Sequence, residues 1–166
     1  LMHLLRNAMD HGLEATEQRK KSGKNPIGTI ILQASHQAGF VVVEVKDDGR
    51  GLDPDKILAA GRRLRIVAED HHPSEQEVLQ LIFQPGFTTN REVTDVSGRG
   101  VGMDAVKKDI EALLGNIEIS SQLGHGTTMK LKLPLSLAII EGMLVRVGIE
   151  TFVLPLLLVT ETLRPL

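Results

Sequence analysis

Two pairs of strand-like segments, separated by helical segments, restrict what this chain can fold into. Residues 29–34 and 40–45 are rich in β-branched side chains and are joined by a short turn, which predicts an antiparallel hairpin. Residues 117–121 and 127–133 predict a second hairpin. In its second segment apolar and polar residues alternate, as in a strand with one buried face. We therefore expect a sheet built from two hairpins.

Helical periodicity occupies the segments around these hairpins. Apolar residues at helical spacing predict helices over residues 1–20, 54–64, 74–82 and 103–114. The third helix begins at a serine followed three residues later by a glutamate, the spacing of a capping box. Gly115 is expected to end the fourth helix. The order of elements predicts an α+β fold, a two-layer sandwich with a mixed, mostly antiparallel sheet and helices on one face.

Composition excludes several classes of function. The chain has 166 residues, 42% hydrophobic and 24% charged, as in ordinary folded domains. A net charge of −2 gives no basic excess for binding nucleic acid or an anionic membrane surface. Because Trp and Tyr are absent, stacking platforms for single-stranded bases are not expected. Because Cys is absent, the chain has no disulfide, thiolate nucleophile or Cys-based metal site.

The two ends of the chain differ from its middle. The sequence begins inside a helical pattern and without an initiator Met, so we expect a piece of a longer protein. No apolar run approaches the ~18 residues of a membrane-spanning helix, so membrane insertion is not expected. After Pro134 two strongly apolar, strand-like segments follow, residues 138–147 and 152–158. Because a lone hairpin is marginal in water, we expect this tail to pack on the preceding domain or to pair with another copy.

The polar face of the first predicted helix is unusual. His3, Asn7 and His11 are spaced by four residues and therefore share one side, flanked by Arg6 and Asp10. Such a face is typical of a solvated amphipathic helix, but two His and one Asn are unusual choices for solubility alone.

A short acidic loop, residues 47–51, directly follows a predicted strand. It is either a solvated loop or a place where a carboxylate is held at a strand end and glycines let a ligand approach. A carboxylate only accepts hydrogen bonds, so it suits adenine, whose exocyclic amine donates, and disfavours guanine. We take Asp48 as the carboxylate for this role.

Alternating glycines precede the helix predicted at residue 103. The segment from Ser97 to Gly102 is either a flexible loop or an anion-binding loop, in which backbone N–H groups and the helix N-terminus attract phosphate. It matches neither the P-loop nor the dinucleotide-binding fingerprint. Two further segments, residues 83–87 and 124–127, have the composition of turns.

Together and in this order, the motifs resemble those of the GHKL, or Bergerat-type, ATP-binding family. Leu4–Asp10 resembles its N box, Asp48–Gly51 its D-x-G-x-G box and Phe83–Phe87 its F box. Gly98–Gly102 resembles the second glycine box, and Gly126–Thr127 the closing G-T element. The resemblance implies a domain that binds ATP with Mg²⁺.

A closer similarity, over nearly the whole chain, is to the chemotaxis-type histidine kinases, the CheA family. LMHLLRNAMDHGLE, LIFQPGFTT and LPLSLAIIEGMLVRVG carry it at the start, middle and end of the chain. It implies an N-terminally truncated ATP-binding catalytic domain over residues 1–134. Residues 135–166 are then the opening strands of a truncated, SH3-like regulatory domain that resembles the coupling protein.

The resemblance also assigns site residues. It implies Asn7 as a catalytic residue and Mg²⁺ ligand, with His3 in the same two roles. The implied ATP-binding residues are Arg6, Asn7, Asp10, His11, Asp48, Gly49, Gly51, Lys56, Ser97, Gly98, Arg99, Gly100, Val101, Gly102, Met103 and Thr127. Thr127 would support adenine recognition through its hydroxyl, and residues 88–97 would form a lid.

The implied activity is phosphoryl transfer from ATP to a His on a separate phosphoacceptor domain in chemotaxis two-component signalling. The alternatives are a GHKL ATP hydrolase and a non-catalytic nucleotide-binding scaffold. Hydrolases of the gyrase, Hsp90 or MutL kind carry Glu at the position of His3, which argues for transfer.

The resemblance implies several partners for the parent kinase. They are its phosphoacceptor domain, response regulators that act through that domain, and, through the regulatory domain, a coupling protein and chemoreceptors. A cytoplasmic, homodimeric parent associated with membrane receptor arrays is expected.

Overall fold

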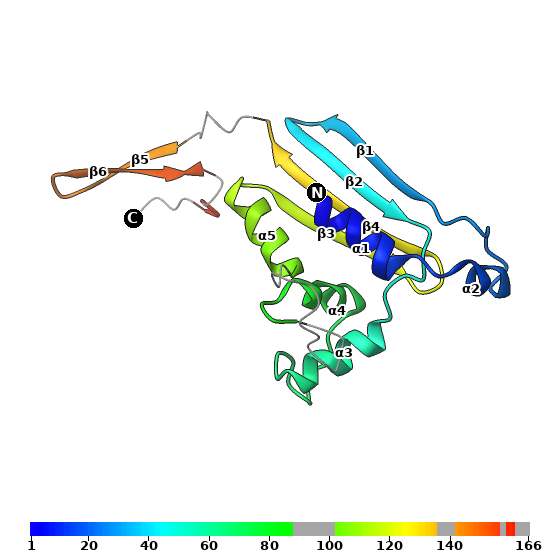
Figure 1. Ribbon diagram of the computed structural model, residues 1–166. Helices are drawn as coiled ribbons and strands as arrows, with labels where there is room; N and C mark the ends of the chain where they lie inside the picture. The colour runs from blue at the N-terminus through cyan, green and yellow to red at the C-terminus, as the bar shows by residue number, and fades with distance from the viewer. Residues whose placement is uncertain (88–101, 136–141, 157–158, 162–166) are drawn as a thin grey trace.

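The computed structural model describes residues 1–87, 102–135, 142–156 and 159–161. Four strands form one sheet in the order β1-β2-β4-β3, and the helices α1, α3, α4 and α5 lie on one side of it (Figure 1). This two-layer α+β arrangement confirms the predicted fold class. Every pairing between the described strands is antiparallel, and the sheet was expected to be mixed but mostly antiparallel.

The two predicted hairpins are present. β1 (Ile30–Gln37) and β2 (Phe40–Asp47) are joined by a two-residue turn in which Ala38 and Gly39 both have positive φ, 46° and 85°. Such a turn matches the twist of the strands that it joins. β3 (Asn116–Gln122) pairs with β4 (Gly126–Pro134), and β4 also pairs with β2. The sheet is thus two hairpins joined through their second strands.

The first predicted helix is interrupted. α1 (Met2–Asn7) continues into a π-helical turn, η1 (Ala8–Gly12), and α2 (Thr16–Lys21) begins after a break. The prediction of one helix over residues 1–20 is therefore wrong. Leu13 has extended backbone angles, and the Gly12 carbonyl accepts a hydrogen bond from the Arg50 N–H at 2.9 Å. The chain leaves the helix there and contacts the loop after β2.

α3 and α4 begin where the sequence predicts. α3 (Pro54–Arg63) follows Asp53, whose side chain accepts from the Lys56 N–H. α4 (Glu75–Gln80) has the predicted capping box and continues as a 3₁₀ turn, η2 (Leu81–Phe83). α5 (Met103–Ala112) ends before Leu114, which takes the left-handed conformation with φ 54°. Gly115, which was expected to end the helix, lies three residues beyond its last residue, and its N–H donates to the Ile110 carbonyl at 2.9 Å.

One core joins the helices to the sheet. It is made of buried apolar side chains from α1, α3, α4, η2 and α5 on one side and from β2, β3 and β4 on the other. Its members are Leu4, Val45, Ile57, Val78, Leu79, Phe83, Val106, Ile110, Ile117, Ile119 and Leu131. Each such side chain contributes about 1.5–3 kcal/mol on burial. Phe87 packs against this core as well, so both phenylalanines of the 83–87 segment are packing residues.

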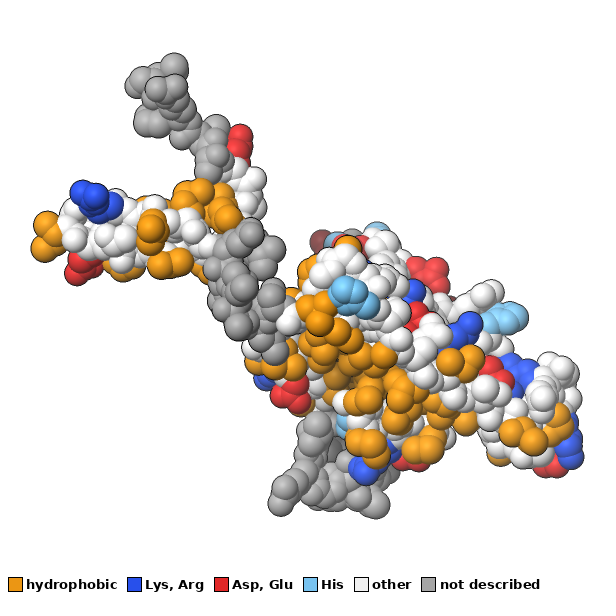
Figure 2. Space-filling model, turned by 90° about the horizontal axis from the view of Figure 1, so that it is seen from above, with side chains coloured by type: hydrophobic (Ala, Val, Ile, Leu, Met, Phe, Trp, Pro, Cys, Tyr) orange, Lys and Arg blue, Asp and Glu red, His pale blue; other side chains and the backbone are white. Residues whose placement is uncertain are grey.

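A second, two-stranded sheet lies near the end of the chain. β5 (Gly142–Val147) pairs with β6 (Glu150–Pro155) in an antiparallel hairpin. Figure 2 shows hydrophobic side chains along it, and Leu144, Val147 and Ile149 are 72%, 64% and 100% exposed. These side chains do not pack on the preceding domain, contrary to one of the two expectations. Pairing with another copy stays a prediction.

None of the helices in the described segments is long and apolar enough to cross a bilayer.

Candidate adenine and phosphate site

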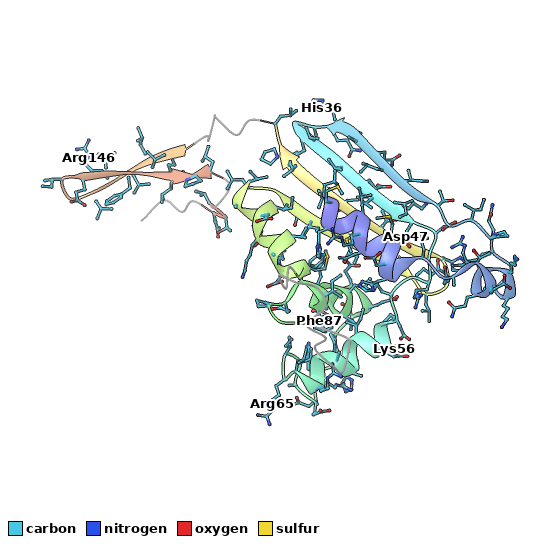
Figure 3. The ribbon with its side chains drawn as sticks, in the orientation of Figure 1. His36, Asp47, Lys56, Arg65, Phe87 and Arg146 are labelled. Atoms are coloured by element: carbon cyan, nitrogen blue, oxygen red, sulfur yellow. The ribbon has the colours of Figure 1, made fainter. Side chains whose placement is uncertain are left out.

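The candidate site lies where β2 ends, next to the first helical segment and the start of β4. Figure 3 shows Asp47 beside the end of α1 and η1, and a side chain at Gly12 would contact the Asp47 carboxylate. β4 brings Thr127 to the same place, because the Thr127 N–H donates to Asp47 Oδ1 at 3.3 Å. Three elements far apart in sequence thus meet at Asp47.

Asp47 is a buried carboxylate with one oxygen already engaged. The side chain belongs to a residue that is 6% exposed, and Oδ1 also accepts from the Gly49 N–H at 2.9 Å. Among the described residues, no donor contacts Oδ2. Burial raises the pKa of Asp47, the nearby Asp48 and Glu14 carboxylates raise it further, and the two N–H bonds oppose the shift. The arrangement holds an acceptor oxygen ready for a ligand that donates a hydrogen bond.

The structure favours Asp47 over Asp48 as the candidate carboxylate, because both side-chain oxygens of Asp48 already have partners. Asp48 Oδ2 lies 2.8 Å from Arg19 Nη2, and Oδ1 accepts from the Thr29 N–H at 2.9 Å. Although partial burial opposes it, these two hydrogen bonds and the charge of Arg19 hold the pKa of Asp48 below its usual range. We therefore prefer Asp47 to the predicted Asp48 as the candidate carboxylate for a ligand.

Two signals in the sequence could have identified Asp47. The spacing D-x-G-x-G is met by residues 47, 49 and 51, not by a motif that begins at Asp48. In addition, Glu44 and Lys46 are polar while Val43 and Val45 are apolar, so the period of two places residue 47 on the buried face.

The glycines of this loop have a different role from the predicted one. A Cβ at Gly49 would lie 2.1 Å from the Gly12 carbonyl oxygen, and one at Gly51 would lie 2.2 Å from that of Gln122. Gly51 also has a positive φ of 68°. These glycines let backbone segments approach each other, and the expectation that they also let a ligand approach stays a prediction.

A hydroxyl network lies behind Thr127. Ser121 Oγ accepts from the Leu52 N–H at 2.8 Å, contacts the Gly126 carbonyl at 3.0 Å and lies 3.0 Å from Thr127 Oγ1. Because the Gly126 carbonyl can only accept, the Ser121 hydroxyl donates to it. The Thr127 hydroxyl then donates to Ser121 Oγ. Thr127 Oγ1 then keeps lone pairs for a ligand or a water.

The polar face of the first helical segment lies against the start of α5. Asn7 Nδ2 donates to Met103 Sδ at 3.0 Å, which leaves the Asn7 side-chain oxygen as an acceptor. Gly102 is the N-cap residue of α5, and no side chain caps that helix. His3 is half-buried, and burial together with the positive charge of Arg6 lowers its pKa, which keeps its imidazole neutral at pH 7. A neutral imidazole and an amide oxygen can both bind a metal ion.

The other predicted residues are less constrained. Arg6, Asp10 and His11 are exposed on the same helical segment. Lys56 is also exposed, lies on α3 away from Asp47 (Figure 3), and pairs with Asp53 at 3.1 Å. Ser97, Gly98, Arg99, Gly100 and Val101, together with the whole predicted lid at residues 88–97, fall outside the described residues. Within the described segments, no group of three His, Asp or Glu side chains could hold a metal.

The chain is similar to known proteins over nearly its whole length. Residues 1–137 match the family described as histidine kinase-, DNA gyrase B-, and HSP90-like ATPase. The chain is 51% identical over 165 residues to the chemotaxis protein CheA of Salmonella typhimurium, covering 99% of this chain and 24% of that protein. It is 46% identical over 166 residues to the sensor histidine kinase CheAY of Helicobacter pylori, covering 99% and 21%.

The chain spans about a quarter of the length of these curated relatives. Among solved structures, the catalytic domain of histidine kinase ThkA aligns with 80% of this chain and 64% of that one, at 21% identity and a TM-score of 0.46.

Proposed function

Because the chain belongs to the family of histidine kinase-, DNA gyrase B- and HSP90-like ATPases, we propose that it is the ATP-binding part of a chemotaxis histidine kinase. In this proposal it binds ATP with Mg²⁺ and transfers the γ-phosphoryl group to a His on a separate phosphoacceptor domain. The observation that carries the proposal is the buried Asp47 carboxylate, with one oxygen bound by backbone N–H groups and the other without a donor among the described residues.

Adenine recognition is assigned to Asp47 and Thr127. The exocyclic amine of adenine donates to Asp47 Oδ2, while a purine with a carbonyl at that position places an acceptor against an acceptor. Thr127 Oγ1 accepts from the same edge of adenine with its remaining lone pairs, directly or through a water. The preference for adenine follows from acceptors that are fixed before the nucleotide binds.

The phosphates and the metal are assigned to the other side of the site. The Asn7 side-chain oxygen and the His3 imidazole would hold Mg²⁺, which commonly takes few protein ligands and several phosphate oxygens. The residues present fit this ion, because the Asn7 amide is already oriented by Met103. The metal would neutralise phosphate charge, while the N-terminus of α5 at Gly102 and Met103, with Arg6 and His11, would bind phosphate oxygens.

Transfer is favoured over hydrolysis by the residue at position 3. The GHKL hydrolases carry a Glu at this position as the base that activates water, and this chain has His3 there instead. Residues 135–166 are proposed as the opening strands of a regulatory domain that binds a coupling protein and chemoreceptors. The parent kinase is proposed as a cytoplasmic homodimer that serves response regulators through its phosphoacceptor domain.

The test is a mixture of this chain, a separate phosphoacceptor domain and labelled ATP with Mg²⁺. We expect label on the acceptor His, and much less of it with the Asp47→Asn variant at an ATP concentration near the dissociation constant of the unaltered chain. Release of inorganic phosphate without acceptor labelling would assign the chain to the hydrolases. Nucleotide binding with neither product would make it a scaffold.

A further inference from the structure

We infer that Arg19 and Lys24 are positioning residues for the proposed adenine-binding carboxylate: they hold the peptide between Asp48 and Gly49 so that its N–H group points at Asp47. Neither residue belongs to the motifs of the ATP-binding family described above. The inference rests on the proposed role of Asp47 in binding adenine.

Arg19 is the most deeply buried charged residue of the described chain. It is 1% exposed although it lies on the short helix α2. Its Nε donates to the Asn25 carbonyl at 2.7 Å, and Nη2 donates to Asp48 Oδ2 at 2.8 Å. Its Nη1 donates both to Glu14 Oε2 and to the Asp48 carbonyl, each at 3.1 Å. A buried guanidinium with so many bonds fixes the geometry of what it binds.

Lys24 contacts the same loop from the same side. Its Nζ donates to the Asp48 carbonyl at 3.1 Å and to the Gly49 carbonyl at 2.6 Å. It also pairs with Glu14 Oε1 at 2.8 Å, so Glu14 joins the two cations. Two positive charges therefore converge on two successive carbonyl groups directly after Asp47.

The peptide plane transmits this contact to Asp47. In a trans peptide the C=O and N–H groups point in opposite directions, and the structure has no cis peptide among its described residues. The Asp48 carbonyl accepts from both cations, and the N–H of the same peptide, that of Gly49, donates to Asp47 Oδ1 at 2.9 Å. The cations thus orient this N–H and polarise it.

The expected consequence is a change in the proton affinity of Asp47. The N–H bond favours the ionised carboxylate, so weakening it raises the pH at which Asp47 binds a proton. The ionisable groups that act on Asp47 are the Asp48 and Glu14 carboxylates, and Arg19 and Lys24 neutralise both. Removing either cation therefore raises the pKa of Asp47 in two ways: it weakens the Gly49 N–H bond, and it leaves the Asp48 and Glu14 carboxylates less neutralised.

The first experiment follows the Gly49 amide by NMR in the nucleotide-free 166-residue chain across a pH titration. We expect the Gly49 signal to titrate with Asp47, and Lys24→Met to move the midpoint upward by about 0.5 on the pH scale. Arg19→Lys keeps the charge but cannot make the same set of bonds, so it should shift the midpoint in the same direction. Lys20→Met is the matched control, because Lys20 is exposed and pairs with Glu17.

The second experiment measures ATP affinity by calorimetry in the same variants. Lys24→Met should weaken binding about three- to tenfold at pH 7 and more strongly at lower pH, while Lys20→Met leaves it unchanged. Unfolding curves establish that each variant is folded, and if Arg19→Lys is not, Lys24→Met carries the test.

The two experiments separate two kinds of failure. If Lys24→Met behaves like Lys20→Met in both the Gly49 titration and ATP affinity, the positioning role is overturned. If Asp47→Asn keeps the affinity of the unaltered chain for ATP, the adenine-binding role of Asp47 is overturned, whatever the Gly49 titration shows.

Discussion

The loop after β2 has two sides that use neighbouring carboxylates in opposite ways. On the inner side, Asp47 is buried, is bound only by backbone N–H groups, and has a raised pKa. On the outer side, Asp48 pairs with Arg19 and has a lowered pKa. The inner carboxylate is held ready for a ligand at a cost in stability, whereas the outer one stabilises the loop that carries it.

The two sides therefore depend on pH in opposite ways. Because the pKa of Asp47 is higher in the folded chain, its contribution to stability is present at low pH and is lost as pH rises through the folded pKa. Because the pKa of Asp48 is lower in the folded chain, its contribution is present above the unfolded pKa and is lost as pH falls through the folded pKa. Four substitutions test this division, in decreasing order of effect on ATP affinity.

Asp47→Asn should have the largest effect. It removes a charge-assisted acceptor, worth ~1.5–3 kcal/mol, so ATP affinity should fall about 10- to 150-fold in calorimetric titration. The Asn oxygen can still accept from Gly49 and Thr127 without the cost of burying a charge. Thermal stability at pH 7 should therefore be equal or higher, and a clear loss of stability would contradict the assignment of Asp47 as a functional, destabilising group.

Asn7→Ala probes the phosphate side of the site. ATP with Mg²⁺ should bind about tenfold more weakly, while metal-free ATP should bind nearly as before, because Asn7 acts through the metal. Asp47→Asn, by contrast, should weaken both forms equally. Titrations with and without Mg²⁺ make this comparison, and equal losses for Asn7→Ala would remove Asn7 from the metal.

Ser121→Ala tests the hydroxyl network of the inner side. It frees the Thr127 hydroxyl to rotate and leaves the Leu52 N–H without its present partner. ATP affinity should fall about three- to fivefold, the size of one neutral hydrogen bond. Ser121→Thr keeps a hydroxyl and is the control; a loss with Ser121→Thr as large as with Ser121→Ala would point to packing instead.

Asp48→Asn should change ATP affinity least. The backbone carbonyl of Asp48 still accepts from Arg19 and Lys24, so we expect a change of less than threefold. The free energy of unfolding, measured in urea at pH 7, should fall by about 1 kcal/mol, a modest value because the Asp48 side chain is 41% exposed. A large loss of affinity with unchanged stability would exchange the roles of the two carboxylates.

Local sequence patterns determined much of the fold. The two hairpins follow from runs of β-branched residues around short turns, and α4 begins at the capping box of Ser74 and Glu77. α3 begins at Pro54. Each of these features is decided by residues within a few positions of one another, so a sequence pattern contains the whole cause. The family resemblance added the order of the motifs and placed Asn7 and Thr127 in one site.

Contacts between distant segments decided the rest. Residues 1–20 have helical periodicity, yet the helix is interrupted after Gly12, whose carbonyl binds Arg50. Asp47 and Asp48 are adjacent and chemically identical. They differ in their surroundings, because Asp47 is buried beside η1 and β4 whereas Asp48 pairs with Arg19. Arg19 lies 29 residues from Asp48, so no local pattern relates them. The sequence shows which residue types could bind ATP. The burial and pairing that set the proton affinity of each carboxylate exist only once the chain has folded.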